Sequence, residues 1–326
     1  MFPNPGIRFI LNNIDNDQPY TPQNQELSFL AAVFTVCLCV LFGANAVAIK
    51  ISLSGLGVFT TAGLRFSMAS ATIFLWARIT GRSFKIKSGQ VRQLLIISMV
   101  FTVQLSLFYL GLSKSNASRG TLMLNLQPFF TLFLAHYFIP GDRITKRKTL
   151  GILLGFAGVV FVFLEKKGVS ADFKVGDLTI LFAAFLWSCS AVYTKRIIHA
   201  FKPFHLVLYP MIFSAPLFFL EGFFWDDAMI THVDAKVFCS LLYQSFVTAS
   251  FCFVAWLTLL KKYGAVALHS FIFIMPVSGV FLGGLVLDEP ITVNILIALL
   301  FVVAGILFIN FKQKKQIPLF PLGRNV

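Results

Sequence analysis

Two ten-residue stretches of this 326-residue chain follow one pattern: LFGANAVAIK at 41–50 and LWSCSAVYTK at 186–195. Each reads Leu, aromatic, two small residues, Asn or Ser, Ala, Val, two variable positions and Lys, and the copies lie 145 positions apart. A pattern that returns in this way predicts an internal duplication. The fold that this duplication produces depends on whether the chain folds in water or in a membrane.

Hydrophobic residues make up 57% of the chain and charged residues only 12%, and the 39 Phe residues are spread along its whole length. About a quarter of the residues in soluble domains are charged. The composition therefore predicts an integral membrane protein. The sequence contains no phosphate-binding loop, nucleophile elbow or zinc-protease motif, so we expect no enzyme, no metal and no cofactor.

Ten apolar runs have the length, about 18 to 25 residues, that a helix needs to cross a bilayer. They lie at 28–50, 57–79, 91–113, 118–139, 147–165, 177–199, 204–224, 236–260, 265–287 and 292–310. The match between the halves continues along these runs, since Pro128 corresponds to Pro276 and residues 157–159 correspond to 304–306. Because each half has an odd number of spans, the copies are expected to lie upside down relative to each other.

We therefore predict an all-α integral membrane protein of ten transmembrane helices, arranged as two inverted five-helix repeats around a central cavity. The expected segments are a tail at 1–27, a first repeat at 28–165, a linker at 166–176, a second repeat at 177–310 and a basic tail at 311–326. Nineteen of the 27 Lys and Arg then lie on one side of the membrane and seven on the other. The positive-inside rule places the N- and C-termini in the cytoplasm, and this bias explains the net charge of +14 without a nucleic-acid partner.

Residues 41–74, LFGANAVAIKISLSGLGVFTTAGLRFSMASATIF, resemble the first repeat of EamA-type carriers of the drug/metabolite transporter superfamily. The shared features are an aromatic-Gly-x-Asn entry, a Lys that ends helix 1, an Arg-Phe pair in helix 2, a Pro in helix 4 and the glycines of helix 5, here Gly151, Gly155 and Gly158. The second repeat departs from this pattern, because Ser190 replaces the Asn and Pro210 stands where the first repeat has Arg65.

The resemblance implies a secondary transporter that moves a small organic solute, an amino acid or related metabolite, by alternating access. It also implies export and a bacterial inner membrane. A membrane-embedded enzyme acting on a lipid-like substrate and a channel or receptor-like component are the alternatives. We expect a monomer whose partners are the small-molecule substrate and the lipid bilayer.

Buried polar groups are costly in a bilayer, so they mark candidate contacts with a substrate. Arg65 lies about 12 Å deep at 1.5 Å per residue, where it would attract a carboxylate. Asn45 stands within the repeated decapeptide, and helix-to-helix hydrogen bonding is the alternative role for it and for the other amides. The remaining candidate substrate contacts are Gln104, Phe108, Asn125, Gln127, Trp187, Ser190, Gln244, Thr248 and His269.

Four further residues are expected to act in structure or gating: Lys50, Pro128, Lys195 and Pro276. The prolines are expected to bend their helices, because proline removes a backbone donor. All 13 acidic residues are expected in loops, tails or span ends. The sequence therefore offers no deep carboxylate for proton coupling, and facilitated diffusion is as open as coupling to protons.

Overall fold

The computed structural model describes residues 28–139, 145–164, 171–202, 204–256, 258–259, 263, 268 and 271–310. Within these residues the chain is helical, apart from one isolated bridge between Leu56 and Ile230. Six helical segments are long and apolar enough to cross a membrane: Phe29–Ser52, Val58–Ile79, Ser88–Lys114, Ala171–Ile197, His205–Trp225 and Ala235–Trp256. The chain is thus a multi-pass, all-helical membrane protein.

The remaining expected spans are shorter or interrupted. Two are the short apolar helices α13 (Ile274–Leu287) and α14 (Val293–Asn310), and α8 (Lys146–Phe163) begins with three basic residues. The expected span 118–139 consists of two helices, α6 (Ala117–Leu124) and α7 (Gln127–Phe138). The described residues therefore give six clear spans, and the predicted number of ten is not confirmed.

The two copies of the decapeptide adopt different backbones. The first is interrupted at Ala44, between α2 (Phe29–Gly43) and α3 (Asn45–Ser52), whereas the second lies inside the continuous helix α9 (Ala171–Ile197). At Gly43 a methyl group would lie 1.9 Å from Oγ of Ser278 and 2.6 Å from a carbonyl oxygen of α13. Only glycine therefore allows α2 to approach α13 so closely.

The predicted bend before Pro128 is present, since α6 ends at Leu124 and α7 begins at Gln127. Pro128 occupies the first turn of α7, where its missing N–H costs nothing. Asn125 donates from Nδ2 to the carbonyl oxygen of Thr121 at 2.8 Å. Ser188 of α9 donates from Oγ to the carbonyl oxygen of Gln127 at 2.8 Å, so the bend is tied to the second repeat.

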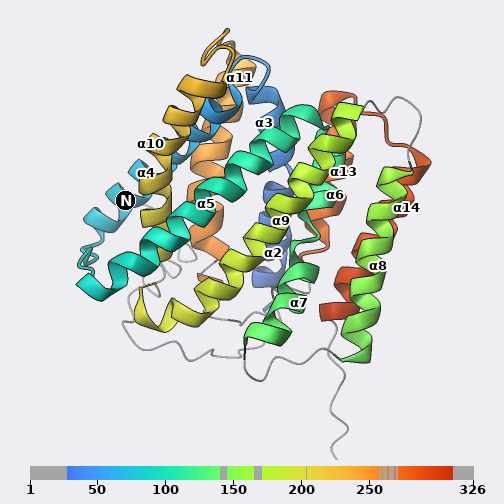
Figure 1. Cartoon of the computed structure of the whole chain (residues 1–326), viewed down its shortest axis with the longest axis horizontal. Helices are drawn as coiled ribbons and strands as arrows, with labels where there is room; N and C mark the ends of the chain where they lie inside the picture. Colours follow the sequence, from blue (N-terminus) through green and yellow to red (C-terminus); the bar gives the residue numbers. More distant parts are fainter. Residues whose placement is uncertain are drawn as a thin grey trace, which may run out of the picture.

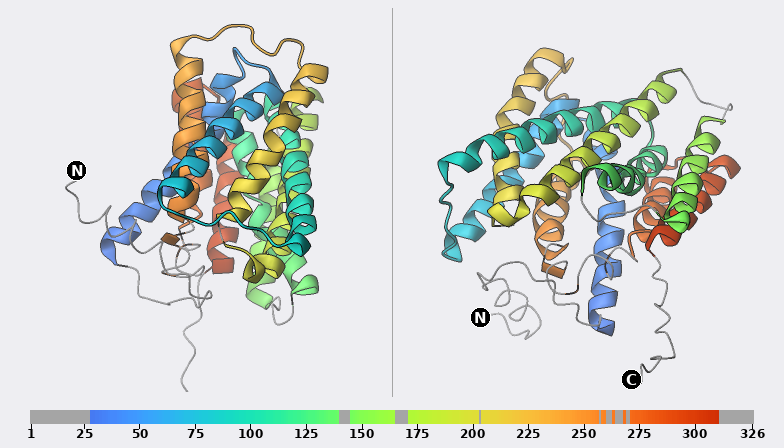
Figure 2. Two further views of the ribbon diagram at one scale, coloured as in Figure 1. Left: turned by 90° about the vertical axis from the view of Figure 1, so that its left-hand side faces the viewer. Right: turned by 60° about the horizontal axis from the view of Figure 1, so that its bottom comes forward.

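Equivalent helices of the two halves run in opposite directions. Lys50, near the end of α3, donates to the carbonyl oxygen of Ser115, and the Ser115 hydroxyl donates to Asp177, near the start of α9. We call this end of the bundle the distal end. The start of α2 and the end of α14 lie at the opposite end of the bundle (Figure 2). Lys195 is exposed near the other end of α9, so the two equivalent lysines lie at opposite ends.

Helices of the two halves pair with each other through glycine contacts. In Figure 1 α8 and α14 lie side by side, as do α5 (Ser88–Lys114) and α9. A methyl group on Gly151 would lie 2.8 Å from the carbonyl oxygen of Gly305, and one on Gly305 would lie 2.7 Å from that of Gly151. Helix α4 (Val58–Ile79) packs on α10 (His205–Trp225), where a methyl group on Gly222 would lie 2.7 Å from Oγ1 of Thr60. The halves are thus interleaved.

The expected span 236–260 contains an unusual backbone. Helix α11 (Ala235–Leu242) continues into η3, a π-helix of ten residues from Tyr243 to Cys252. Ser250 donates from Oγ to the carbonyl oxygen of Ser245, five residues earlier, at 2.7 Å. π-Helices are rare and occur frequently at functional sites. This segment brings Gln244 and Thr248 into the centre of the bundle, where both are fully buried.

Candidate functional site

Arg65 lies in the middle of α4 and is only 5% exposed. Its Nη1 donates to the hydroxyl of Tyr109 on α5 at 3.1 Å, and its Nη2 donates to Oγ1 of Thr248 on η3 at 3.2 Å. Its guanidinium carbon lies 5.0 Å from the ring centroid of Phe66. A cation deep in a helical membrane protein is costly and marks a functional site by default.

The hydrogen bonds continue from these partners to the first helix pair. Tyr109 donates to Oε1 of Gln244 at 3.1 Å, and Gln244 donates from Nε2 to Oγ of Ser52 at 2.7 Å. Thr248 lies 2.9 Å from Oδ1 of Asn45, to which its hydroxyl donates. These contacts join α3, α4, α5 and η3. We call the set the central network: Asn45, Ser52, Arg65, Tyr109, Gln244 and Thr248.

The charge of the central network is not balanced. Among the described residues no carboxylate is hydrogen bonded or ion paired to Arg65, whose partners are neutral hydroxyl groups and an aromatic ring. Its Nε is buried and has no hydrogen-bond partner there. A guanidinium offers five donors in a planar fork that matches a carboxylate. The network can therefore supply the positive half of an ion pair.

Four predicted substrate contacts, Asn45, Arg65, Gln244 and Thr248, meet in the central network. Two of its members, Ser52 and Tyr109, were not predicted. Tyr109 follows Phe108 directly, but pairing a polar residue with a contact residue four positions later selects Gln104 and Phe108 instead. An amphipathic Tyr in the middle of a long apolar run is the signal that would have found it, because a buried Tyr hydroxyl needs a partner.

The other predicted substrate contacts on α5 and at the helix break have separate surroundings. Gln104 is 1% exposed, and its Oε1 has no partner among the described residues. Phe108 is buried and packs edge-to-face on Tyr109, with ring centroids 6.0 Å apart. Asn125 and Gln127 bond within their own helix pair, Gln127 to Oγ1 of Thr131 at 3.4 Å. None of these contacts joins them to Arg65.

On α9 the predicted substrate contacts Trp187 and Ser190 lie close to a buried serine, Ser188. Trp187 and Ser190 are half-buried, and Trp187 packs against the main apolar core. Ser188, which matches Gly43 of the first copy, is the residue that bonds to Gln127. His269 lies outside the described residues. Pro276 is buried in the first turn of α13.

A second polar cluster closes the distal end. Arg119 on α6 and Asp177 on α9 form an ion pair in which their side chains are 2% and 0% exposed. Nε of Arg119 donates to Oδ2 of Asp177 at 2.9 Å, and the Ser115 hydroxyl donates to Oδ1 at 2.6 Å. Because the pair joins residues of different halves, it holds the halves together at this end.

Two more charged groups complete this cluster at helix ends. Glu289, after α13, accepts from the backbone N–H of Ala117 at 2.6 Å and from the N–H and hydroxyl of Ser118 at 2.8 and 2.6 Å. Lys50 donates to the carbonyl oxygens of Leu112, Ser113 and Ser115 at the end of α5. Each charge thus meets the complementary end of a helix dipole. We call these residues the distal cluster: Lys50, Ser115, Ser118, Arg119, Asp177 and Glu289.

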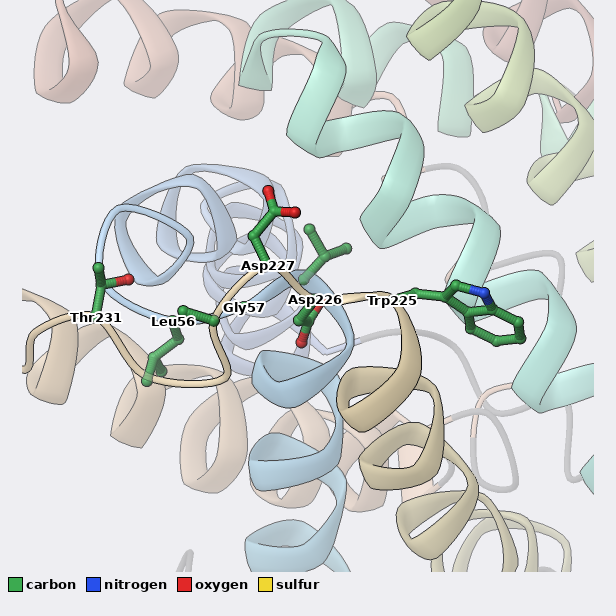
Figure 3. A pocket seen from close by; sticks show the side chains of 8 residues that line it. Leu56, Gly57, Trp225, Asp226, Asp227 and Thr231 are labelled. Carbon is green, nitrogen blue, oxygen red and sulfur yellow. The ribbon is translucent and has the colours of Figure 1, made fainter.

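A third acid of the second half binds the first half nearby. Asp226 follows α10 and accepts from the backbone N–H groups of Phe59 and Thr60, at 3.1 and 2.9 Å, at the start of α4. Figure 3 shows Asp226 at this helix end, with Asp227 on the other side of the same turn. The adjoining hollow of about 290 Å³ is lined by residues 56–58, 225–228 and Thr231.

The acids are placed differently from the prediction in one respect. Asp177 was expected at the start of a span, but α9 begins at Ala171, so Asp177 lies inside the helix and is fully buried. A buried carboxylate requires a cation or several donors, and Arg119 and Ser115 supply them. Within the part of the chain that the structure describes, no three His, Cys, Asp or Glu side chains come together as a metal site would require.

Comparisons with known proteins agree with this architecture. A family model described as the EamA-like transporter family matches residues 29–164 and again residues 174–311. A solved crystal structure superposes with a TM-score of 0.65 at 17% identity, covering 86% of this chain and 96% of the other, which supports the fold alone.

Three curated relatives are transporters by name. The uncharacterized transporter YoaV of Bacillus subtilis is 22% identical over 86% of this chain and 97% of its own length. A probable amino-acid metabolite efflux pump of Escherichia coli is 28% identical, covering 80% of this chain and 88% of its own. Its counterpart from Salmonella typhimurium is also 28% identical, covering 83% and 91%. The chain therefore belongs to the EamA-like transporter family, with one family unit in each half, and is a transporter of small solutes.

Proposed function

We propose that this protein is a secondary transporter that exports a small solute with a carboxylate group, an amino acid or a related metabolite. The observation that supports this most directly is Arg65, a buried cation without a carboxylate partner among the described residues. Two relatives are named probable amino-acid metabolite efflux pumps, which fits a substrate of this class and this direction.

The substrate carboxylate binds Arg65 in place of the hydroxyl groups of Tyr109 and Thr248. A charge-assisted, two-pronged ion pair is roughly twice as strong as bonds to neutral oxygens, so this exchange is favourable. The displaced hydroxyls keep partners, because Tyr109 still donates to Gln244 and Thr248 still donates to Asn45. The remaining predicted contacts, Gln104, Phe108, Asn125, Gln127, Trp187, Ser190 and His269, are proposed to line the central cavity when it opens.

The transport cycle is alternating access between two inverted five-span halves. The two halves are in contact at the distal end. Three acids of the second half bind helices of the first half there: Asp177, Asp226 and Glu289. Opening the distal end requires that these contacts separate, so they are the distal gate. Lys50 belongs to that gate, and Lys195 takes the equivalent place at the opposite end.

The protein works as a monomer in a bacterial inner membrane, with both termini in the cytoplasm. The excess of Lys and Arg on the side of the termini supports this orientation, because such residues are retained on the cytoplasmic side. In this orientation the distal end faces outward. Ten membrane crossings follow if α6–α7, α8, α13 with the residues before it, and α14 each count as one.

Uptake into liposomes containing the purified protein tests this proposal. A radiolabelled amino acid is compared with the amine that lacks its carboxylate, without nucleotide. We expect saturable transport of the amino acid alone, and a loss in kcat/KM of roughly 10- to 100-fold in Arg65→Ala, since hydrogen bonds to charged groups contribute about 1.5–3 kcal/mol. Arg78→Ala is the matched control, because Arg78 lies exposed on the same helix.

Two results would contradict the proposal. Unchanged kinetics in Arg65→Ala would remove Arg65 from the substrate site. Equal transport of the amine and the amino acid would show that the carboxylate is not recognised.

A further inference from the structure

We propose that Glu221 and the hollow beside it bind the ammonium headgroup of an aminophospholipid from the surrounding bilayer. Glu221 lies near the distal end of α10 and is half-buried. Its Oε2 accepts from the hydroxyl of Ser106 on α5 at 2.6 Å. The proposal is independent of the substrate that the central network carries.

Glu221 differs from the other acids that are not exposed in the described residues. Asp177 is paired with Arg119, and Asp226 and Glu289 each accept from backbone N–H groups at a helix start. For Glu221 the described residues supply a single neutral hydroxyl. A carboxylate that is withdrawn from water needs a cation or several donors. Among the described residues no cation is paired with Glu221, so a cationic ligand would complete the site.

The hollow beside Glu221 has the shape and lining for an amphiphile. It has a volume of about 440 Å³. Apart from Glu221 and Ser106, its walls are Phe59, Val103, Leu107, Leu110 and Trp225. Val103 and Trp225 are 45% and 68% exposed, so the hollow opens on the outer surface of α5 and α10. In Figure 3 the indole of Trp225 points away from the Asp226 turn and lies beside α5.

The position of the hollow identifies the ligand as a lipid. Glu221 stands four residues before the end of α10, about 6 Å along the helix axis. Exposed Trp residues at helix ends mark the level of the lipid headgroups. An aminophospholipid brings its ammonium group to this level and an acyl chain below it, matching the carboxylate and the apolar wall. Two buried rings, Phe66 of α4 and Phe218 of α10, pack together with centroids 5.7 Å apart. They belong to the interior of the bundle, whereas the hollow opens on its outer surface.

Fluorescence quenching by brominated lipids tests the site. Trp76, Trp187 and Trp256 are replaced by Phe, which leaves Trp225 as the only Trp of the chain. The protein is reconstituted in phosphatidylcholine vesicles that contain increasing amounts of brominated phosphatidylethanolamine or brominated phosphatidylglycerol. We expect phosphatidylethanolamine to bind beside Trp225 about two- to fivefold more strongly than phosphatidylglycerol, which has no cation, as one partly exposed ion pair provides. Phosphatidylcholine carries a cation that cannot donate a hydrogen bond, so it is expected to bind with intermediate strength.

Substitutions in the same background assign the preference to Glu221. Glu221→Gln is expected to remove it, and Asp227→Asn, an exposed acid of the same end, is expected to leave it intact. Native mass spectrometry of the otherwise unmodified chain with and without Glu221→Gln gives the second measurement, should the Trp replacements impair folding. Equal binding of all headgroups, a preference for phosphatidylglycerol, or an unchanged preference in Glu221→Gln would overturn the proposal. Transport of an alkylammonium ion that Glu221→Gln abolishes would also overturn it, by assigning the hollow to the substrate.

Discussion

Arg65 and Arg119 are both buried guanidinium groups of the first half, but their surroundings are opposite. Arg119 faces Asp177, which is fully buried, and the pair also receives the hydroxyl of Ser115. Arg65 is 5% exposed and faces the neutral hydroxyls of Tyr109 and Thr248. Among the described residues one cation is neutralised by a carboxylate and the other is not, and we propose that a ligand supplies the missing charge. The comparison predicts that Arg119 maintains the structure and that Arg65 serves transport.

The largest expected effect comes from breaking the neutralised pair. Arg119→Met leaves Asp177 buried without its cation and is expected to lower the free energy of unfolding by roughly 3–5 kcal/mol. Arg65→Met is expected to change it by less than about 1 kcal/mol, because both hydroxyl partners keep another hydrogen bond. Unfolding of both variants in detergent, followed by fluorescence, measures the difference.

A double variant controls for the change of shape at this site. Arg119→Met with Asp177→Leu removes both charges and is expected to restore most of the stability, as apolar replacements of buried ion pairs commonly do. Equal losses in Arg119→Met and Arg65→Met would show that the two arginines are not used differently.

The next-largest expected effect is the stabilisation of the protein by a ligand that binds Arg65. A substrate with a carboxylate, added at about 100 times its Kd, is expected to stabilise the wild-type protein by about 2.7 kcal/mol. Arg65→Met is expected to show no such gain, while Arg78→Met retains it. A thermal shift in detergent measures this, and stabilisation of Arg65→Met by the same compound would show that its carboxylate binds elsewhere.

The smallest expected effect on stability concerns Glu289, an acid of the distal cluster that faces the start of a helix and not a cation. Glu289→Gln keeps a hydrogen-bond acceptor at the start of α6 but removes the negative charge, so we expect a loss of about 1 kcal/mol. The exposed neighbour provides the control, since Asp288→Asn is expected to change stability by less than about 0.5 kcal/mol. Chemical unfolding of both variants would detect the difference, and indistinguishable curves would argue against this role for Glu289.

The repeated decapeptide predicted the two halves, and a family match to each half confirms them. It did not predict that the first copy is interrupted at Ala44 while the second is continuous. Directly before the interruption Gly43 lies close to α13, more than 200 residues away in the sequence, and no local pattern contains such a contact. The π-helix of η3 was missed for a similar reason, because its apolar pattern suits an α-helix equally well.

The part of the candidate site that the sequence predicts is the part marked by a residue that is costly to bury in a membrane. Arg65 stood out for that reason, and Asn45, Gln244 and Thr248 proved to be its neighbours. Arg119 has the same cost but was counted among the seven cations on the outer side, at the start of the expected span 118–139, because its partner lies 58 positions away on another helix. Pairing between distant helices requires the fold, so the distal cluster emerged only from the structure.

The contact between α8 and α14 has a consequence for synthesis of the chain. Gly151 and Gly305 each lie against the other helix backbone, and α8 makes most of its contacts with α14. Since α14 is translated after the other described helices, α8 lies in the membrane without its main partner while the helices between them are synthesised. Packing of α8 in the nascent protein is therefore completed only after α14 has entered the membrane.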